Sequence, residues 1–232
     1  MTRDAERVAR SQEQPIVGGL PDVPGIGVAM RLTPGLGVHL RGLADELLVH
    51  DFPGSTIERA EREMLATAVS AANDCFFCMD SHGAFAGALL EQSGSTDRLP
   101  LVDAIKVGSS DGFDDKMTAL LKIARTVRAD PRALTERDVA GAHEAGASEA
   151  DVQLAILIAS AFSMYNRFVD GFRARTAPTP AAYRERAGEI AANGYSAPSP
   201  SAAAASAAAS IGTGVPVGAA PAAAATGSGS SR

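Results

Sequence analysis

The sequence predicts an all-α protein of 232 residues, and three observations support that prediction. Between residues 38 and 172, apolar side chains recur every three or four positions, which is the spacing of one face of a helix. Capping residues, prolines and glycines separate these periodic segments. No segment alternates apolar and polar residues over the length of a half-buried strand. We therefore expect one helical domain over residues 36–190, which is long enough to bury a core.

The first 35 residues do not follow the helical spacing. Prolines and glycines recur between Pro15 and Gly37, and they forbid a long helix there. Apolar side chains nevertheless occupy this stretch between Ile16 and Val28. We expect residues 1–35 to form an extended arm that packs on its own core or on a neighbouring copy of the chain.

Two helices are expected ahead of the two cysteines. The first starts near Val38 and ends before Pro53, with a stripe of leucines on one face. The second opens with a capping box of the S-x-x-E type over Ser55–Glu58. Its apolar face runs from Ile57 to Val69.

A third helix is expected to begin at the cysteines. Asp74 or Asn73 is its expected N-cap, which places Cys75 in the first turn, where the helix dipole favours a thiolate. This helix runs to about Gln92. Further helices are expected at Leu99–Val107, Asp114–Arg128, Glu136–Glu144 and Glu149–Phe172, the last two with caps at Thr135-x-x-Asp138 and Ser148-x-x-Asp151.

Composition narrows the classes of function. The net charge is −6 and no basic stripe is present, so nucleic-acid binding has no electrostatic support. The first ten residues alternate charges and lack the apolar centre of a signal peptide. No apolar run approaches the ~18 residues of a membrane span. We expect a cytoplasmic protein without membrane or nucleic-acid partners, in which a C-x-x-C pair is typically catalytic rather than a structural crosslink.

From residue 196 onward the sequence consists almost entirely of alanine, serine, proline, glycine and threonine. Arg232 is the only charged residue there, so residues 196–232 cannot bury a core and we expect a disordered tail. Ile211, Val215 and Val217 lie close together in this tail. Their spacing resembles a docking peptide on a tether, of the kind that attaches enzymes to protein shells. The alternative is a plain low-complexity extension.

The stretch Cys75–His82 is the candidate reactive site. It contains the only two cysteines of the chain, with a histidine four positions after the second. Residues three and four apart are neighbours on a helix, so Cys78 would contact both Cys75 and His82. The thiolate is the reactive form of cysteine, and a neighbouring imidazole can take its proton or stabilise its charge. The pattern indicates a redox or nucleophilic dithiol.

Glu63 is the candidate carboxylate of this site. It lies on the preceding helix, and an antiparallel pairing of the two helices would return it toward the thiols. The alternative is that Glu63 is one more charge on a solvated face. Its position between Ala60 and Thr67, close to the apolar stripe, distinguishes it from Glu61.

Two other uses of the cysteines stay open. Both could be small buried hydrophobes without reactivity. Zinc could also use them, but a structural zinc site needs four ligands, and His39, His50 and His143 are scattered along the chain. We expect neither a metal nor a cofactor.

The pattern Glu63-x11-Cys75-x-x-Cys78-x-x-x-His82 resembles the AhpD-like alkylhydroperoxidases, which belong to the carboxymuconolactone decarboxylase superfamily. The later run Met164–Phe172 is similar to a second signature of the peroxidase-related branch. The similarity spans roughly residues 36–175. It implies an all-α AhpD-like bundle, a homo-oligomer such as a trimer or a hexamer, and antioxidant reduction of hydroperoxides by thiols.

The resemblance also implies a role for each residue. Cys78 is the buried attacking thiol, and Cys75, the more exposed one, resolves it by forming a disulfide. Glu63 and His82 relay protons. The substrate is an alkyl hydroperoxide or hydrogen peroxide, and a dithiol or thioredoxin-like reductant reopens the disulfide.

The sequence departs from AhpD at one position. AhpD has a histidine directly before its second cysteine, where this chain has Phe77, so part of the relay is missing. An alternative function is therefore a redox adaptor or sensor that passes electrons through the same dithiol without efficient peroxide turnover. A third is a helical oligomer with inert cysteines.

Overall fold

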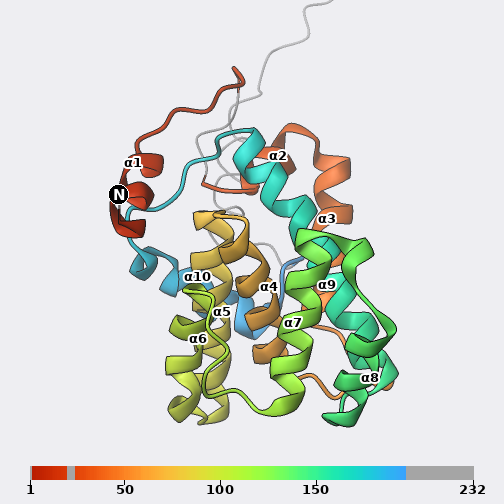
Figure 1. Ribbon diagram of the computed structural model, residues 1–232. Helices are drawn as coiled ribbons and strands as arrows, with labels where there is room; N and C mark the ends of the chain where they lie inside the picture. Colours follow the sequence, from red (N-terminus) through yellow and green to blue (C-terminus); the bar gives the residue numbers. More distant parts are fainter. Residues whose placement is uncertain (1, 20–23, 197–232) are drawn as a thin grey trace, which may run out of the picture. The chain divides into compact units, whose positions relative to one another are not determined.

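The computed structural model describes residues 2–19 and 24–196, and every regular element within these ranges is a helix (Figure 1). The all-α fold is therefore confirmed. The α-helices are α1 (Arg3–Ser11), α2 (Gly27–Leu32), α3 (Pro34–Leu48), α4 (Arg59–Ala72), α5 (Phe76–Ser93), α6 (Leu99–Lys106), α7 (Asp115–Ala129), α8 (Glu136–Glu144), α9 (Glu149–Gly171) and α10 (Arg184–Asn193). Short 3-10 turns occur at η1 (Thr96–Arg98), η2 (Pro131–Ala133) and η3 (Pro180–Tyr183).

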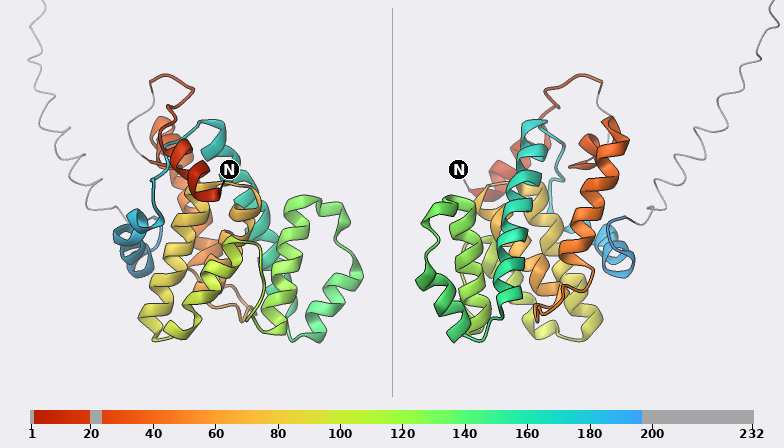
Figure 2. Two further views of the ribbon diagram at one scale, coloured as in Figure 1. Left: turned by 60° about the vertical axis from the view of Figure 1, so that its left-hand side comes forward. Right: turned by 90° about the vertical axis from the view of Figure 1, so that its right-hand side faces the viewer.

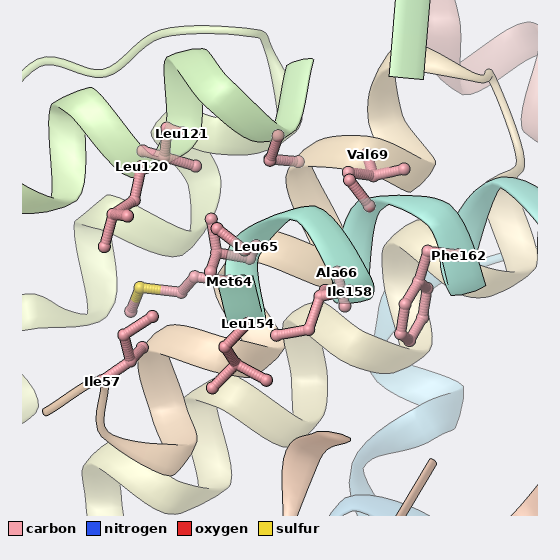
Figure 3. Packing of buried hydrophobic residues seen from close by; sticks show 14 of the residues in the cluster. Ile57, Met64, Leu65, Ala66, Val69, Leu120, Leu121, Leu154, Ile158 and Phe162 are labelled. Carbon is pink, nitrogen blue, oxygen red and sulfur yellow. The ribbon is translucent and has the colours of Figure 1, made fainter. Parts of the chain in front are cut away.

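Helix α4 forms the centre of the fold. Every residue from Ala60 to Ala71 is buried, and the helix packs against α5, α7 and α9. Fully burying one large apolar side chain stabilises a fold by about 1.5–3 kcal/mol, so such a cluster fixes the position of α4. Figure 3 shows its members: Met64, Leu65, Ala66 and Val69 of α4, Leu120 and Leu121 of α7, and Leu154, Ile158 and Phe162 of α9, with Ile57 ahead of α4.

Helix α9 is a core helix of this bundle. By length and composition it could cross a membrane, but 56% of its most apolar window is buried inside the structure. It packs against α4 and α7 along one side (Figure 3). This packing is that of a helix with one face in the core of a helical domain.

Two of the predicted helix caps are observed, and the one predicted for α4 is not. Thr135 and Ser148 form the expected capping boxes. The box expected at Ser55–Glu58 is wrong, because α4 begins after Glu58 and the Glu61 carboxylate accepts the Glu58 backbone N–H at 3.0 Å. The Ser55 hydroxyl, which was expected to cap the helix, instead donates to the buried carboxylate of Asp151 at 2.7 Å.

The N-terminal arm is not extended throughout, which corrects the expectation for residues 1–35. Helix α1 begins after the Thr2 cap and ends at Ser11, ahead of the first proline at Pro15, so nothing in its sequence stops it. The short helix α2 follows near the end of the arm. Helix α3 then starts at Pro34, four residues before the expected start.

The arm packs against its own chain (Figure 2). Arg7 of α1 is buried and donates from Nε to the Asp80 carboxylate of α5 at 2.6 Å. Farther along, the backbone N–H of Ile16 donates to the carbonyl of Phe172 at 3.3 Å, and that of Gly25 donates to Arg175 at 2.9 Å. The first of the two packing alternatives for the arm, its own core, is the one observed.

The folded part also extends beyond residue 190. Helix α10 packs on α5, and the backbone N–H groups of Tyr195 and Ser196 donate to Asp45 of α3. Apart from Ser196, the predicted tail over residues 196–232 and its docking segment lie outside the described residues.

Candidate functional site

The turn between α4 and α5 sets the position of the two cysteines. Asp74 has a left-handed backbone with φ of 55°, and the N–H of Cys75 donates to the carbonyl of Ser70 at 3.0 Å. The N–H of Asp74 donates to Ala71 at 3.3 Å, so the pair of bonds is the Schellman end of a helix, with aspartate where glycine is usual.

Cys75 is itself the N-cap of α5, which corrects the expected cap at Asn73 or Asp74. Its carbonyl accepts the N–H of Met79 at 2.9 Å, the first bond of the helix. Cys78, and not Cys75, therefore lies within the first turn of α5. There the unpaired backbone N–H groups favour a negative charge.

Both thiols are free and buried, with exposed fractions of 0% for Cys75 and 2% for Cys78. The expectation that Cys75 is the more exposed of the two is wrong, because the N-terminal arm covers both. Val28 of the arm packs on the dithiol together with Val169 and Ala174. We call this set of three residues the apolar cover of the dithiol.

Gly25 brings the backbone of the arm against Phe77, the residue between the cysteines. A Cβ on Gly25 would lie 1.9 Å from Cζ of Phe77, so only glycine permits this approach. Its φ of +61° is a second reason for glycine at this position. The backbone of the arm at Gly25 therefore lies directly against the Phe77 ring.

The surroundings of Cys75 favour its protonated thiol. A hydrogen bond to Cys78, and then burial, raise the pKa of the Cys75 thiol, so Cys75 keeps its proton. Asp170 of α9 lies beside Cys75. Burial raises the pKa of this carboxyl group, and a hydrogen bond from the Cys75 thiol opposes that shift. Cys75 thus lies between the Asp170 carboxyl group and the second sulfur.

Glu63 and His82 meet one helical turn beyond Cys78. Glu63 is fully buried, and its Oε2 lies 2.7 Å from Nδ1 of His82. Of the two interpretations of Glu63, the solvated face is therefore wrong. Tyr195, after α10, completes the group: its hydroxyl donates to Oε1 of Glu63 at 2.5 Å and lies 3.2 Å from Nδ1 of His82.

Aromatic rings enclose the imidazole of His82. Phe162 of α9 makes an edge contact with a centroid separation of 4.6 Å, and Phe85 makes another at 5.2 Å. These rings fill the space around the imidazole without supplying hydrogen bonds. Its Nδ1 is held by Glu63, which leaves Nε2 as the nitrogen open to another partner.

The dithiol and the Glu63–His82 pair are neighbouring groups rather than one bonded network. Within residues 2–19 and 24–196, no hydrogen bond joins Cys78 to His82. Four residues of helix separate them by a rise of about 6 Å, a gap that a bound substrate or a water molecule can bridge. Cys78 and His82 therefore lie one helical turn apart on α5 without a direct hydrogen bond.

Three residues of the site were given no role from the sequence, although Asn166 and Asp170 lie in the run Met164–Phe172. Asn166 donates to the Ser70 hydroxyl at 3.1 Å and thus ties α9 to the turn before Cys75. Asp170, one helical turn later, faces Cys75. The four-residue spacing of Asn166 and Asp170 places both on one face of α9, and this was the available signal. Tyr195 gave none, because it follows the last predicted helix.

The described part of the chain contains no group of three or more histidine, cysteine, aspartate or glutamate side chains able to hold a metal ion. The donors around the dithiol are already paired with one another. Glu63 pairs with His82 and Tyr195, and Asp170 with Cys75. The arrangement is suited to proton transfer beside a thiol.

Comparison with known proteins shows what the region around this site is similar to. Residues 43–126 match the carboxymuconolactone decarboxylase family, and this range includes Glu63, both cysteines and His82. Asp170 and Tyr195 lie outside the matched range. No curated protein matches the sequence.

Two solved structures share the fold. One is the alkylhydroperoxidase AhpD core of an uncharacterized peroxidase-related protein from Ralstonia eutropha JMP134, with 23% identity and a TM-score of 0.59. The match covers 72% of this chain and 82% of that one. The other is an uncharacterized peroxidase-related protein from Silicibacter sp. TM1040, with 21% identity and a TM-score of 0.58, covering 75% and 93% of the two chains.

Proposed function

We propose that the chain is a dithiol peroxidase that reduces alkyl hydroperoxides or hydrogen peroxide, because residues 43–126 match the carboxymuconolactone decarboxylase family and the fold is AhpD-like. The observation that carries the proposal is the asymmetric dithiol. Cys75 stays protonated and hydrogen-bonded to Cys78, and a buried Glu63–His82 pair lies one turn away. Inert structural cysteines need neither a carboxylate beside Cys75 nor an oriented imidazole nearby.

The first step uses Cys78 as the nucleophile. Its thiol gives its proton to Nε2 of His82, while Glu63 holds Nδ1. The thiolate attacks the terminal oxygen of ROOH, so that an S–O bond forms and the O–O bond breaks. The leaving alkoxide takes the proton from His82, which yields ROH and a sulfenic acid on Cys78.

The second step uses Cys75. Its proton passes to the Asp170 carboxylate, which already accepts its hydrogen bond. The Cys75 sulfur attacks the Cys78 sulfur, an S–S bond forms, the S–O bond breaks, and the leaving hydroxide takes the proton from Asp170 to give water. A dithiol reductant then reopens the disulfide by thiol–disulfide exchange and is itself oxidised to a disulfide.

Peroxide consumption with a supplied dithiol tests this proposal. Purified full-length protein should consume cumene hydroperoxide or hydrogen peroxide, and Cys78→Ser should abolish the turnover. His82→Ala should lower the rate by about 10²–10⁴-fold, the usual contribution of general acid–base catalysis. Mass spectrometry after mild peroxide treatment should show the loss of two hydrogens within the peptide that holds both cysteines. If both thiols stay alkylatable after peroxide, the proposal is wrong.

A redox adaptor is the second candidate. Two observations favour it: Phe77 replaces a relay histidine of AhpD, and the apolar cover shields the dithiol from solvent. An adaptor would exchange its disulfide rapidly with a partner dithiol but turn over peroxide no faster than the free dithiol does. The same assay, run with and without the protein, separates the two functions.

A further inference from the structure

The segment that follows α10 reaches into the candidate site. Tyr195 has a partly buried ring, which stacks beside the His82 imidazole at a centroid distance of 5.9 Å. Its hydroxyl donates to Oε1 of Glu63 at 2.5 Å. Burial, and then the charge of Glu63, raise the pKa of Tyr195 well above its usual range, so the hydroxyl keeps its proton and remains a donor.

Asp45 of α3 holds this segment in place. Its side chain is buried, and its Oδ1 accepts the N–H of Tyr195 at 2.6 Å while its Oδ2 accepts the N–H of Ser196 at 2.9 Å. Gly194 has a φ of +75°, and a Cβ there would lie 2.7 Å from Oδ1 of Asp45. Only glycine permits this close approach of the backbone before Tyr195 to Asp45. We call the contact of Asp45 with residues 194–196 the C-terminal clasp.

We propose that Tyr195 is a positioning residue of the proton relay, held by the C-terminal clasp, and that it fixes the Glu63–His82 pair with Nδ1 of His82 protonated and Nε2 open toward Cys78. The kinetic consequence rests on the proposed function, whereas the state of the His82 ring does not.

The hydrogen bonds of Glu63 carry this argument. In the described residues the Glu63 side chain has two partners, His82 at Oε2 and Tyr195 at Oε1. An ionised carboxylate only accepts, so Nδ1 of His82 must donate and the lone pair is left on Nε2. If the hydroxyl is removed, a fully buried carboxylate oxygen loses its donor, which is costly unless the group moves or takes up a proton. After either response, the proton of the His82 ring is no longer fixed on Nδ1.

The other charged groups that act on Tyr195 do not replace its hydroxyl. Arg59 of α4 and Asp45 of α3 shift the pKa of Tyr195 in opposite directions through their charges. Arg59 donates to the backbone carbonyl of Ala191, and the Asp45 oxygens are occupied by the clasp. The hydroxyl is therefore the group to remove in a test.

Nitrogen NMR of the histidine rings tests the proposal directly. The chain has four histidines, so the His82 signals can be assigned by comparison with His82→Gln. Wild type should show the Nδ1–H form of His82, and Tyr195→Phe should give a mixture of tautomers or a shifted titration. Tyr165→Phe is the matched control, because its buried hydroxyl donates to the carbonyl of Leu40 and contacts neither Glu63 nor His82. An identical His82 spectrum and titration in wild type and Tyr195→Phe would overturn the proposal.

The rate of alkylation of Cys78 against pH supplies the functional readout, measured in a Cys75→Ser background. Tyr195→Phe should slow alkylation near neutral pH by about tenfold and shift the profile, since charge-assisted hydrogen bonds contribute about that much. Asp45→Asn, which loosens the clasp, should act in the same direction, and Tyr165→Phe should leave the profile unchanged. Circular dichroism shows whether each variant is folded.

The outcomes separate this inference from the proposed function. If wild type fails to turn over peroxide but Tyr195→Phe alters the His82 tautomer, the positioning role stands and the peroxidase proposal fails. If wild type turns over peroxide and Tyr195→Phe leaves both the ring and the profile unchanged, the peroxidase stands and the positioning role fails.

Discussion

At the scale of single residues, Cys75 and Cys78 have different surroundings although they are three positions apart. Cys75 caps α5 and forms a hydrogen bond with Asp170, whereas Cys78 lies in the first helical turn. Cys75→Ser should therefore still reduce one equivalent of peroxide and accumulate a sulfenic acid on Cys78, and Cys78→Ser should do neither. Trapping with dimedone followed by mass spectrometry measures the sulfenic acid. A sulfenic acid on Cys75 in Cys78→Ser would reverse the two roles.

Asp170 gives a second residue-scale prediction. If it takes the proton of Cys75, Asp170→Asn should leave sulfenic acid formation on Cys78 unchanged but slow the disulfide step by about 10²-fold or more. Stopped-flow measurement of both steps checks this. The control is Asp74→Asn, which removes an exposed carboxylate next to Cys75 and suits the left-handed backbone there. Equal slowing in both variants would mean that only the local charge matters.

At the scale of elements, Asp151 joins the start of α9 to the segment before α4. Buried and fully enclosed, it accepts hydrogen bonds from Ser148, Ser55 and Thr56. Burial alone would raise its pKa, but these bonds together lower it to about 2.

The sign of the resulting pH dependence follows from that pKa. Since the folded pKa lies below the unfolded value of about 3.9, Asp151 stabilises the fold above pH ~4, and this contribution is lost as the pH falls toward about 2. The contribution is on the order of 2 kcal/mol. Asp151→Asn should unfold at lower urea concentration at pH 6, and the gap to wild type should narrow by pH 2.5. A gap that stays constant with pH would show that the charge is not responsible.

The same element shows what the sequence could and could not predict. Helix α9 and its capping box at Ser148 were predicted within one residue, because periodicity and caps are local signals. The role of Ser55 was not, because its partner Asp151 lies 96 positions away. The dithiol and His82 were likewise found as a local motif. Asp170 and Tyr195 reach the site through packing of distant segments. Asp170 lies in the run Met164–Phe172, but that run does not show that Asp170 contacts Cys75, and no local pattern marks Tyr195.

At the scale of the whole molecule, large apolar side chains remain exposed on α3, α9 and the arm. They include Leu36, Val38, Leu43, Leu157, Ile16 and Val17. A hollow of about 530 Å³ nearby is lined mainly by Val17, Met164, Phe168 and Phe172. Apolar surface of this kind marks a protein interface in soluble proteins.

We expect a homo-oligomer that buries this surface. Light scattering at micromolar concentration should give a multiple of 23.7 kDa. Val38→Asp should reduce the assembly to monomers by placing a charge in the interface, whereas Val107→Asp should not. Val107 is exposed to 76% but follows α6, which packs on α4 and α5 rather than on α3 or α9. A monomeric wild type would contradict the expectation.

The arm and the helical core together determine access to the dithiol. Both thiols are buried beneath the apolar cover, so a peroxide or a reductant reaches them only when the arm moves away from Phe77. Gly25→Ala should hold the arm away, because its Cβ would collide with the Phe77 ring and alanine is strained by about 1–2 kcal/mol at this backbone conformation. The core between α4, α7 and α9 does not contain Gly25, so the melting temperature should change little.

Reaction with a chromogenic disulfide reagent measures this access, since the chain has only two cysteines. Gly25→Ala should react at least about tenfold faster than wild type, because local opening no longer has to displace the arm. Gly18→Ala is the matched control: it changes the same arm, but a Cβ there meets nothing within 4 Å. If Gly25→Ala and Gly18→Ala both react as slowly as wild type, a different segment protects the thiols. If both react faster to the same degree, the arm opens without regard to its contact with Phe77.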